Sequence, residues 1–261
     1  MTVHPHQLTF QNGQPKIAVP IVTTTPEAAL DYFKQLDIRQ FDLVEWRLDA
    51  LKFPVDLPTI VATAQAIHRD CPLLATIRTS AEGGQWDLQA TPYTATYTAL
   101  LEAEAVDLID LEAALPTTIT TPLQTLAHQH HILTIASYHN FDQTPKLTEL
   151  HDLLAQLEAT GADLIKFAVM PTNSQDVLTV LTAINQYHGQ RPLIAMAMGD
   201  LGKITRLSGH LFPTALTFAT AGVASAPGQL TVTTVQNALK ILNGRNWNGW
   251  SKPTPPRNWR D

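Results

Sequence analysis

The sequence has little of several features that mark particular classes of protein. A single cysteine, Cys71, excludes an internal disulfide, and its position before an apolar run predicts a small core residue. No run approaches the roughly 18 apolar residues of a membrane-spanning helix, and Met1 to Phe10 carry no basic stretch followed by an apolar one. We therefore expect a cytoplasmic protein without a membrane partner.

Positive charge and cofactor motifs are also scarce. Lys and Arg number 17 against 23 Asp and Glu, and the net charge of −6 repels nucleic acid. No strand is followed by a Gly-rich dinucleotide loop, and no P-loop is present. His128, His130 and His131 cluster, but they lack a carboxylate at ligand spacing and suit a solvated surface better than a metal site. We expect a small-molecule ligand, no cofactor and no metal.

Apolar, β-rich runs alternate with segments of helical spacing along most of the 261 residues. This alternation predicts parallel strands joined by right-handed crossovers, and eight such units at this length favour an α/β fold of the (β/α)₈ TIM-barrel type. An open doubly wound sheet is the alternative. The eight predicted strands are Ile17–Val22, Leu43–Leu48, Leu73–Thr79, Leu108–Leu111, Ile132–Ser137, Leu164–Met170, Leu193–Met198 and Ala215–Ala219.

The two ends of the chain differ from this pattern. Leu8 to Phe10 and Lys16-Ile17 flank Asn12-Gly13, which predicts an N-terminal β-hairpin with a type I′ turn. Residues 1–242 are expected to form one barrel domain, and 243–261 an irregular extension rich in Trp and Pro. We expect its tryptophans to dock on the barrel, with docking on a second subunit as the alternative.

Four Thr-Pro pairs precede segments of helical spacing, at Thr25, Thr91, Thr121 and Thr144. Thr can accept bonds from the free N–H groups of a helix start, while Pro fits the first helical position because no donor is needed there. Each pair therefore predicts the beginning of a helix.

Charged residues interrupt the predicted strands with a period of two. Because strand side chains alternate, Glu45, Arg47 and Asp49 point toward the barrel axis. Any one charge could belong to an architectural ion pair, but unpartnered interior charges are costly, and barrel active sites lie at the C-terminal ends of strands. The set predicts a pocket for a polar, anionic ligand. The same alternation predicts that seven further residues point inward: Thr76, Arg78, Asp110, Glu112, Ser137, His139 and Lys166.

Two of these residues have the chemistry of catalysis. Lys166 lies in an otherwise apolar strand, and desolvation favours the neutral amine that attacks a carbonyl to form an imine. A point charge that binds an anion is the alternative role. His139 follows a strand at the barrel mouth, where an imidazole can transfer protons near neutral pH.

Five short motifs follow one another along the chain: Glu45-Trp46-Arg47, Arg78-Thr79-Ser80-Ala81-Glu82-Gly83-Gly84, Ser137-Tyr138-His139-Asn140-Phe141, Arg206-Leu207-Ser208-Gly209 and Ser225-Ala226-Pro227-Gly228-Gln229. In this order they resemble the type I 3-dehydroquinate dehydratases, the Schiff-base dehydratases of the shikimate pathway, and the resemblance runs from about Lys16 to Leu242. The segments around His139 and Lys166 are similar to those that bear the family's catalytic histidine and imine lysine.

The resemblance implies a catalytic set of Lys166, His139 and Glu82. Lys166 would form an imine with the ketone of 3-dehydroquinate, and His139 would remove a proton and return one to the departing hydroxyl, a syn elimination that gives 3-dehydroshikimate. Glu82 would orient His139.

The same resemblance implies the residues that bind the substrate. Arg206 would hold its carboxylate, and Ser225 and Gln229 would add hydrogen bonds. Glu45, Arg47 and Arg78 would bind hydroxyls or set the local field. Met196 and Met198 would line the pocket near the substrate ring, with core packing as the alternative.

Two other functions remain open at this stage. An aldolase-like enzyme would share the imine lysine but cleave a carbon–carbon bond, and a barrel that only binds a hydroxylated acid would need neither Lys166 nor His139. We expect a homodimer, because two-fold assemblies are the commonest. The sequence leaves open whether the pathway served is biosynthetic or degradative.

Overall fold

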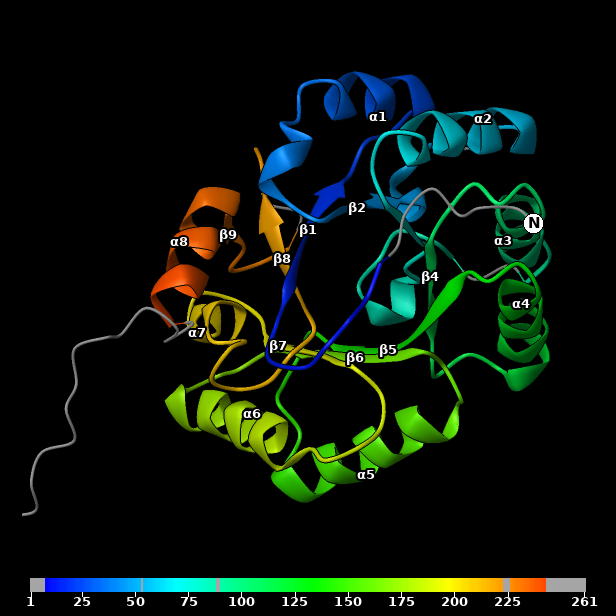
Figure 1. The fold of residues 1–261 in the computed structure, drawn as a ribbon. Helices are drawn as coiled ribbons and strands as arrows, with labels where there is room; N and C mark the ends of the chain where they lie inside the picture. Colours follow the sequence, from blue (N-terminus) through cyan, green and yellow to red (C-terminus); the bar gives the residue numbers. More distant parts are fainter. Residues whose placement is uncertain (1–7, 53, 88–89, 223–225, 243–261) are drawn as a thin grey trace, which may run out of the picture.

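Eight parallel strands curl around one axis in the computed structural model, which describes residues 8–52, 54–87, 90–222 and 226–242 (Figure 1). The Ala215 N–H, just before β8, donates to the carbonyl of Leu193 at the start of β7 over 2.7 Å, which joins the two ends of the sheet. The predicted (β/α)₈ barrel is confirmed. Its strands are β1 (Lys16–Ile21), β2 (Leu43–Arg47), β3 (Leu73–Thr76), β4 (Leu108–Glu112), β5 (Leu133–Asn140), β6 (Leu164–Val169), β7 (Leu193–Ala197) and β8 (Leu216–Thr220), and a short β9 (Leu230–Thr231) pairs with β8.

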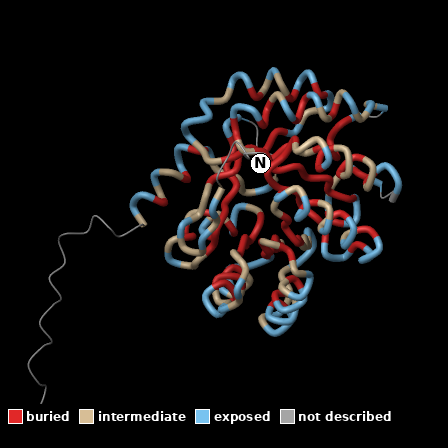
Figure 2. Tube along the Cα trace, turned by 45° about the vertical axis from the view of Figure 1, so that its right-hand side comes forward, coloured by how far each residue is buried: buried red, intermediate tan, exposed pale blue. Residues whose placement is uncertain are grey.

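Helices form a ring outside the strands, and their inner faces are buried while their outer faces are exposed (Figure 2). Among the described residues, no helix has the length and apolar character needed to cross a membrane. The helices are α1 (Pro26–Phe33), α2 (Leu57–His68), α3 (Ala90–Glu102), α4 (Thr117–Gln129), α5 (Leu147–Ala159), α6 (Ser174–Gln186), α7 (Lys203–Leu207) and α8 (Val232–Leu242), with short 3₁₀ turns η1 (Ile38–Gln40), η2 (Leu48–Ala50) and η3 (Ser80–Glu82).

Only one of the four Thr-Pro pairs caps a helix as predicted. The Thr25 hydroxyl accepts the Ala28 N–H over 3.2 Å, with Pro26 at the first position of α1. The pair at Thr91 lies in the first turn of α3, which begins at Ala90, and the pair at Thr144 lies just before α5, so both mark a helix start although neither threonine is the cap. The prediction at Thr121 is wrong. Pro122 lies inside α4, where its ring leaves one helical bond unmade, and α5 starts where the Glu149 side chain accepts the Lys146 N–H over 2.8 Å.

The N-terminal ends of alternate strands, here called the strand entrances, share one hydrogen-bonding pattern. An Asp-Leu pair begins β2, β4 and β6, and each aspartate accepts the N–H of the neighbouring residue at the start of the preceding strand. All three bonds are 2.8 Å long: Asp42 to Ile17, Asp107 to Leu73, and Asp163 to Thr134. These bonds satisfy buried donors that have no ladder partner and fix the register at the N-terminal end of the barrel.

The fourth strand entrance of this kind lies between β7 and β8 and has Ala215 in place of an aspartate. Here Asn12 supplies the acceptor, and its side-chain oxygen receives the Leu193 N–H at the same 2.8 Å. The adjacent Gly13 donates its N–H to the Thr214 carbonyl over 3.0 Å. The N-terminal segment is therefore bound across the seam of the barrel.

The predicted N-terminal hairpin is wrong. A turn does form at Asn12-Gly13, but only Gly13 has a positive φ (+80°), as in a type II turn, whereas the predicted type I′ turn needs positive φ at both residues. Leu8 to Phe10 form no strand, because the Asn12 side chain bonds to β7 and the Gly13 backbone bonds to the loop before β8. The side chains of Leu8 and Phe10 instead pack against the apolar residues inside the barrel.

The barrel interior changes character along its axis. Near the N-terminal ends of the strands, inward-facing residues such as Leu43, Leu74, Leu108 and Leu164 form one apolar cluster. Two residues further along β2 to β6 the inward positions become polar or charged, as the alternation of side chains predicts. The apolar layer closes the floor of the barrel and leaves the charged layer at its mouth. Cys71 is buried in the outer core, as predicted, and burial raises its pKa to about 12.

The Thr25 cap makes a testable difference to stability. Thr25→Ala removes the acceptor for Ala28 and is expected to lower the free energy of unfolding by about 1 kcal/mol in urea denaturation. Thr121→Ala is the matched control, because Thr121 also precedes a proline but lies inside α4. A loss of the same size in both variants would contradict the capping role.

Candidate active site

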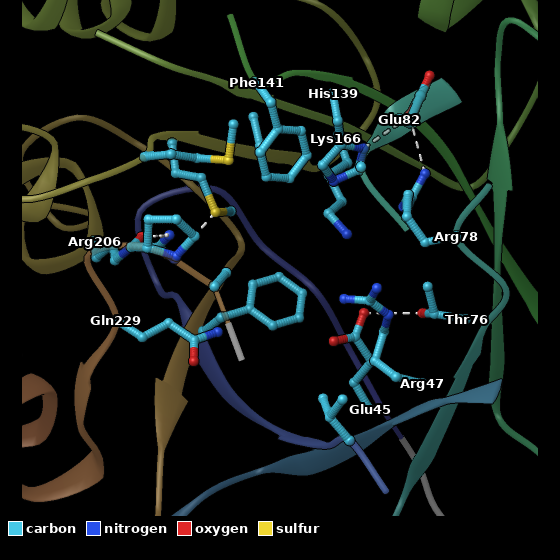
Figure 3. A pocket seen from close by; sticks show the side chains of 18 of the residues that line it. Glu45, Arg47, Thr76, Arg78, Glu82, His139, Phe141, Lys166, Arg206 and Gln229 are labelled. Atoms are coloured by element: carbon cyan, nitrogen blue, oxygen red, sulfur yellow. Dashed lines mark hydrogen bonds and ion pairs between the residues drawn. The ribbon is translucent and has the colours of Figure 1, made fainter. Parts of the chain in front are cut away.

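A pocket opens at the C-terminal ends of the strands, at the mouth of the barrel (Figure 3). Its volume is about 290 Å³, which suits a metabolite rather than a polymer. The lining residues are Val22, Glu45, Arg47, Thr76, Arg78, Glu82, Gly83, Gln85, His139, Phe141, Lys166, Ala168, Met196, Met198, Arg206, Phe218, Ala226, Pro227 and Gln229.

The pocket has a charged side and an apolar side. The strands β2, β3, β5 and β6 and the loop after β3 supply most of the charged and hydroxyl groups, whereas β7 and β8 supply Met196 and Phe218. Met198, just after β7, extends the apolar side toward the mouth. Both methionines therefore line the pocket as well as packing in the core. Such a pocket fits a ring with polar substituents on one side and hydrocarbon on the other.

Lys166 projects from β6 into the pocket and is only 4% exposed. Its Nζ donates to Asp110 Oδ2 over 3.0 Å and lies 4.9 Å from the centre of the Phe218 ring. Its neighbours Ile165 and Phe167 point outward into the core beneath the helices. Alternation along β6 thus fixes the direction of the lysine, and Asp110 and Phe218 fix the place of its nitrogen.

His139 lies near the end of β5, the strand paired with β6, and its Nδ1 is 2.9 Å from Glu82 Oε2. Burial raises the pKa of Glu82 to about 8, against the opposing charge of Arg78. Burial lowers the pKa of His139 well below its usual value, and the charges of Arg78 and Lys166 add to the effect. At neutral pH the shared proton therefore resides on Glu82, and the imidazole is uncharged.

Glu82 owes its position to the loop after β3. It ends the turn η3, and Gly83 follows with a left-handed φ of +78°. A Cβ at Gly83 would collide with the ring of Phe141, which stacks near His139. Glycine therefore allows the glutamate, the histidine and the phenylalanine to approach one another.

Arg78 is the centre of a buried network and is only 3% exposed. Its Nη1 donates to Glu82 and Glu112, each over 3.0 Å, and its Nη2 donates to Asp110 over 2.8 Å. Burial alone would lower the pKa of Arg78, but the three carboxylates raise it, so the guanidinium stays charged. Arg78 thus organises the charged side, and its donors already have protein partners.

Sequence reasoning turned Asp110, Glu112 and Ser137 inward but gave them no role. Glu112 accepts both the N–H of Thr79 (2.7 Å) and its hydroxyl (2.6 Å), which anchors the loop that carries Glu82. Asp110 bonds Arg78, Ser137 and Lys166. The alternation of side chains along each strand was enough to predict that these groups point inward. Their hydrogen-bond partners depend on the stagger between neighbouring strands, which cannot be read from the sequence.

Glu45 and Arg47 line the charged side of the pocket from β2. The Thr76 hydroxyl donates to Glu45 over 2.9 Å. Arg47 forms two bonds of 2.7 Å to Asp49, which holds the guanidinium at the edge of the pocket. Burial by itself would lower the pKa of Arg47, but the bond to Asp49 outweighs it and raises the pKa. Asp49 therefore positions Arg47 rather than lining the pocket itself.

Arg206 reaches the pocket from α7 and is only 2% exposed. Its Nη1 contacts Met196 Sδ at 3.2 Å and its Nη2 donates to the Pro227 carbonyl at 3.3 Å, while its buried Nε has no hydrogen-bond partner among the described residues. Burial lowers the pKa of Arg206 to about 10. Within the described structure it forms no ion pair with a carboxylate, so it can accept an anionic ligand group.

Gln229 lines the mouth through a close approach of two loops. Gly228 has a φ of +76°, and a Cβ there would collide with the carbonyl of Gly199. Glycine at this position lets the two loops touch and brings Gln229 to the pocket. The remaining predicted site residue, Ser225, lies outside the described residues, as does the predicted extension at 243–261.

The surface histidines have other partners. His128 lies 3.0 Å from Asp163, and His130 lies 3.3 Å from Glu104. Over the part of the chain that the structure describes, no group of three or more His, Cys, Asp or Glu residues could hold a metal ion.

Known proteins resemble this chain over most of its length. The family model of type I 3-dehydroquinase matches residues 17–246. The 3-dehydroquinate dehydratase of Syntrophotalea carbinolica is 37% identical over 93% of this chain and 98% of its own length, and that of Lactiplantibacillus plantarum is 38% identical over 88% and 93%. The crystal structure of 3-dehydroquinate dehydratase from Geobacillus kaustophilus superposes with a TM-score of 0.84 at 35% identity, covering 89% of this chain and 93% of that one.

A second solved relative is the type I 3-dehydroquinate dehydratase from Clostridium difficile, with covalently modified comenic acid. Its TM-score is 0.85 at 34% identity, and the match covers 90% of this chain and 95% of that one. Together with the barrel and its charged mouth, these matches define a hydro-lyase on a (β/α)₈ scaffold. The chain belongs to the type I 3-dehydroquinase family.

The network around Arg78 predicts a large effect on stability. Arg78→Met leaves three buried carboxylates without their shared cation, and removing one partner of a buried ion pair costs about 3–5 kcal/mol in the free energy of unfolding. Arg39→Met is the control, because Arg39 pairs with Asp37 in solvent. Urea denaturation is expected to show a large loss only for Arg78→Met; equal small losses would contradict a central role.

Proposed function

We propose that this protein converts 3-dehydroquinate to 3-dehydroshikimate by syn elimination of water, through an imine on Lys166 with His139 as general acid and base. The observation that carries the proposal is the pairing of β5 and β6, which sets a buried lysine beside a histidine bonded to Glu82 at the pocket mouth. The family's place in the shikimate pathway fits this reaction.

The pocket supports a defined orientation of the substrate. Its carboxylate binds Arg206, whose Nε has no other partner among the described residues. The hydrocarbon part of the ring lies against Met196 and Phe218. The hydroxyls then face the charged wall, where Glu45 and Arg47 can bond them.

Further binding groups complete this orientation. Gln229 closes the mouth with an amide. Ser225 adds a hydroxyl, as the resemblance to the family implies. Arg78 acts through the local field, because its donors are already bonded to carboxylates.

Imine formation begins with Lys166 as an ammonium ion beside Asp110. The ammonium loses a proton to the neutral His139, and the free amine attacks the ketone carbon. One amine proton moves to the oxygen to give a neutral carbinolamine. The imidazolium then returns its proton to that hydroxyl as the carbon–oxygen bond breaks and water leaves. The lysine nitrogen then has a double bond to carbon, keeps one hydrogen and carries the positive charge. Overall, an ammonium ion and a ketone give an iminium ion and water.

Elimination follows from the electron demand of the iminium. His139 Nε2 takes a proton from the adjacent carbon, and the carbon–hydrogen electrons move toward the nitrogen to give a neutral enamine. The imidazolium then gives a proton to the tertiary hydroxyl as its carbon–oxygen bond breaks. One histidine on one face of the ring performs both transfers, so the elimination is syn.

Glu82 sets the state of His139 during these steps. When Glu82 is a carboxylate it accepts the Nδ1 hydrogen, which leaves Nε2 free to act as the base, and it stabilises the imidazolium that forms. At lower pH the Glu82–His139 pair takes up one additional proton, and this proton resides on Glu82 because the pKa of Glu82 is raised and that of His139 is lowered. The base form therefore grows as pH rises through the raised pKa of Glu82, about 8.

Two alternatives fit the pocket less well. An aldolase acting on a phosphorylated sugar needs a cluster of free donors, but Nη1 and Nη2 of Arg78 and Nε and Nη2 of Arg47 are bonded to protein carboxylates. A protein that only binds an acid needs no histidine–glutamate pair with shifted pKa values. The covalent modification in the Clostridium difficile relative supports covalent chemistry in this family.

We further propose that the protein acts as a cytoplasmic homodimer, with 1–242 as a single catalytic domain. Closed two-fold assemblies are the commonest form of soluble oligomer. Sedimentation velocity of the full chain measures the state directly, and the tail beyond 242 can be tested by comparing the chain with and without it.

The imine has a direct chemical test. Borohydride added with 3-dehydroquinate is expected to fix a covalent adduct on Lys166, located by peptide mass spectrometry. Lys166→Ala should lose both the adduct and all measurable formation of the conjugated enone, read by its ultraviolet absorbance. Lys34→Ala is the control, because Lys34 pairs with Asp31 on the surface of α1.

His139→Ala separates binding from elimination. This variant keeps Lys166 and is expected to form some adduct while losing nearly all turnover. A normal rate in the Lys166 variant would overturn the mechanism. Absence of adduct in a correctly folded His139 variant would assign imine formation to a different set of groups.

The Glu82–His139 pair predicts a shift in the pH profile. Glu82→Gln cannot hold the extra proton, so the acid limb of kcat/KM is expected to move to lower pH, toward the depressed pKa of His139. The maximal rate should fall about ten- to hundredfold, because the amide stabilises the imidazolium less well. A lower rate with the acid limb unmoved would show that Glu82 does not share this proton.

A further inference from the structure

Asp110 is the acidic residue that contacts the reactive nitrogen most directly. Its Oδ2 accepts from Lys166 Nζ over 3.0 Å, and it is only 1% exposed. This is the one ion pair of Lys166 within the described structure. The side chain comes from β4, so the contact spans β5 and reaches the second strand along the barrel.

The carboxylate of Asp110 is held on its other side. Its Oδ1 accepts from Arg78 Nη2 over 2.8 Å and from the Ser137 hydroxyl. Burial alone would raise the pKa of Asp110, but Arg78 and Lys166 outweigh burial and lower it strongly. Asp110 is therefore a fixed anion with one oxygen directed at the lysine, and it is a poor proton acceptor.

The surroundings of this pair contain several other charges. The Tyr97 hydroxyl also approaches Asp110, but it donates to the main-chain carbonyl over 2.6 Å, and burial keeps it neutral. Arg206 lies on the apolar side, against Met196. The groups that face the pair are Glu45 and Arg47 from β2, Arg78 from the segment after β3, Glu82 from η3, Glu112 from β4 and His139 from β5.

Each of the other carboxylates has a different partner. Glu112 is bonded to Thr79, and Glu82 is bonded to His139. Glu45 accepts from the Thr76 hydroxyl. These assignments leave Asp110 as the carboxylate placed to compensate a charge on the lysine nitrogen.

The charge on that nitrogen is the same before and after imine formation. The resting ammonium and the iminium each carry one positive charge and at least one N–H, and the reaction between them releases water without changing the net charge. A carboxylate that bonds the ammonium is therefore already placed for the iminium. Because it is fixed by Arg78 and Ser137, it needs no reorganisation at that step.

We propose that Asp110 is the counter-ion of the Lys166 iminium, which keeps the imine protonated and so keeps it an electron sink. The proposal rests on the proposed function, because it requires an imine on Lys166. Asp110 acts on the lysine nitrogen through one retained N–H···O bond, and Phe218 adds the face of its ring at 4.9 Å on another side.

The test measures protonation of the imine rather than turnover. Cyanoborohydride reduces an iminium ion much faster than a neutral imine, so its rate of adduct formation on Lys166 falls as the imine loses its proton. With Asp110→Asn and 3-dehydroquinate, the midpoint of this fall is expected about one to three pH units below that of the unaltered enzyme. At a fixed alkaline pH this is a loss of about tenfold per unit.

Glu112→Gln is the matched control. Glu112 is equally buried and shares Arg78, but it does not contact Lys166, so its midpoint should stay close to that of the unaltered enzyme. Coincident midpoints for the unaltered enzyme and Asp110→Asn would overturn the counter-ion role while the adduct still supports the proposed function. An equal shift in both variants would also overturn it, because the effect would then belong to overall charge.

A second measurement serves if Asp110→Asn does not fold. Isotope-edited infrared spectroscopy of the unaltered enzyme, with ¹⁵N-labelled lysine, reports the C=N stretch, which moves in D₂O only when the nitrogen is protonated. The proposal requires that shift from neutral to mildly alkaline pH. A neutral imine over that range would overturn the proposal, and the absence of any lysine adduct would overturn the proposed function as well.

Discussion

The active-site half of this barrel depends on one buried cation, Arg78. A guanidinium with 3% exposure bonds three carboxylates that come from η3 and β4, and each of these carboxylates holds another part of the site. Glu82 contacts the histidine, Asp110 the lysine, and Glu112 the loop that carries Glu82. The guanidinium opposes the effect of burial on these carboxylates and keeps Asp110 an anion, whereas the pKa of Glu82 is still raised to about 8.

The site needs some groups that exchange protons and others that keep a fixed charge. A nucleophilic amine and a proton-accepting imidazole must each be able to lose or gain a proton, whereas the carboxylate beside the amine must stay charged. The proton of the Glu82–His139 pair is mobile because burial has brought the two groups into competition for it. Asp110, in contrast, is fixed as an anion by Arg78. Arg78 therefore contacts both Glu82, which exchanges a proton with His139, and Asp110, which stays an anion.

The sequence predicted the barrel, the eight strands and the inward direction of the charged residues, because the period of two along each strand is a local property. It did not predict which charges pair, since Arg78 and Asp110 are 32 positions apart and the stagger between β3 and β4 decides their contact. It also failed where tertiary contacts override local signals. Asn12-Gly13 bonds to the barrel seam instead of forming a hairpin, and Pro122 lies within a helix that had already begun.

The four matched bonds at the strand entrances have a consequence for how the chain can be cut or joined. Three are made by aspartates that enter with their own strands, but the fourth comes from Asn12, 181 residues before its partner Leu193. The turn at Asn12-Gly13 is thus a structural part of the strand pair β7–β8. A chain shortened to begin at Lys16 would keep every strand and every pocket residue, yet it would leave a buried amide at the seam without its acceptor.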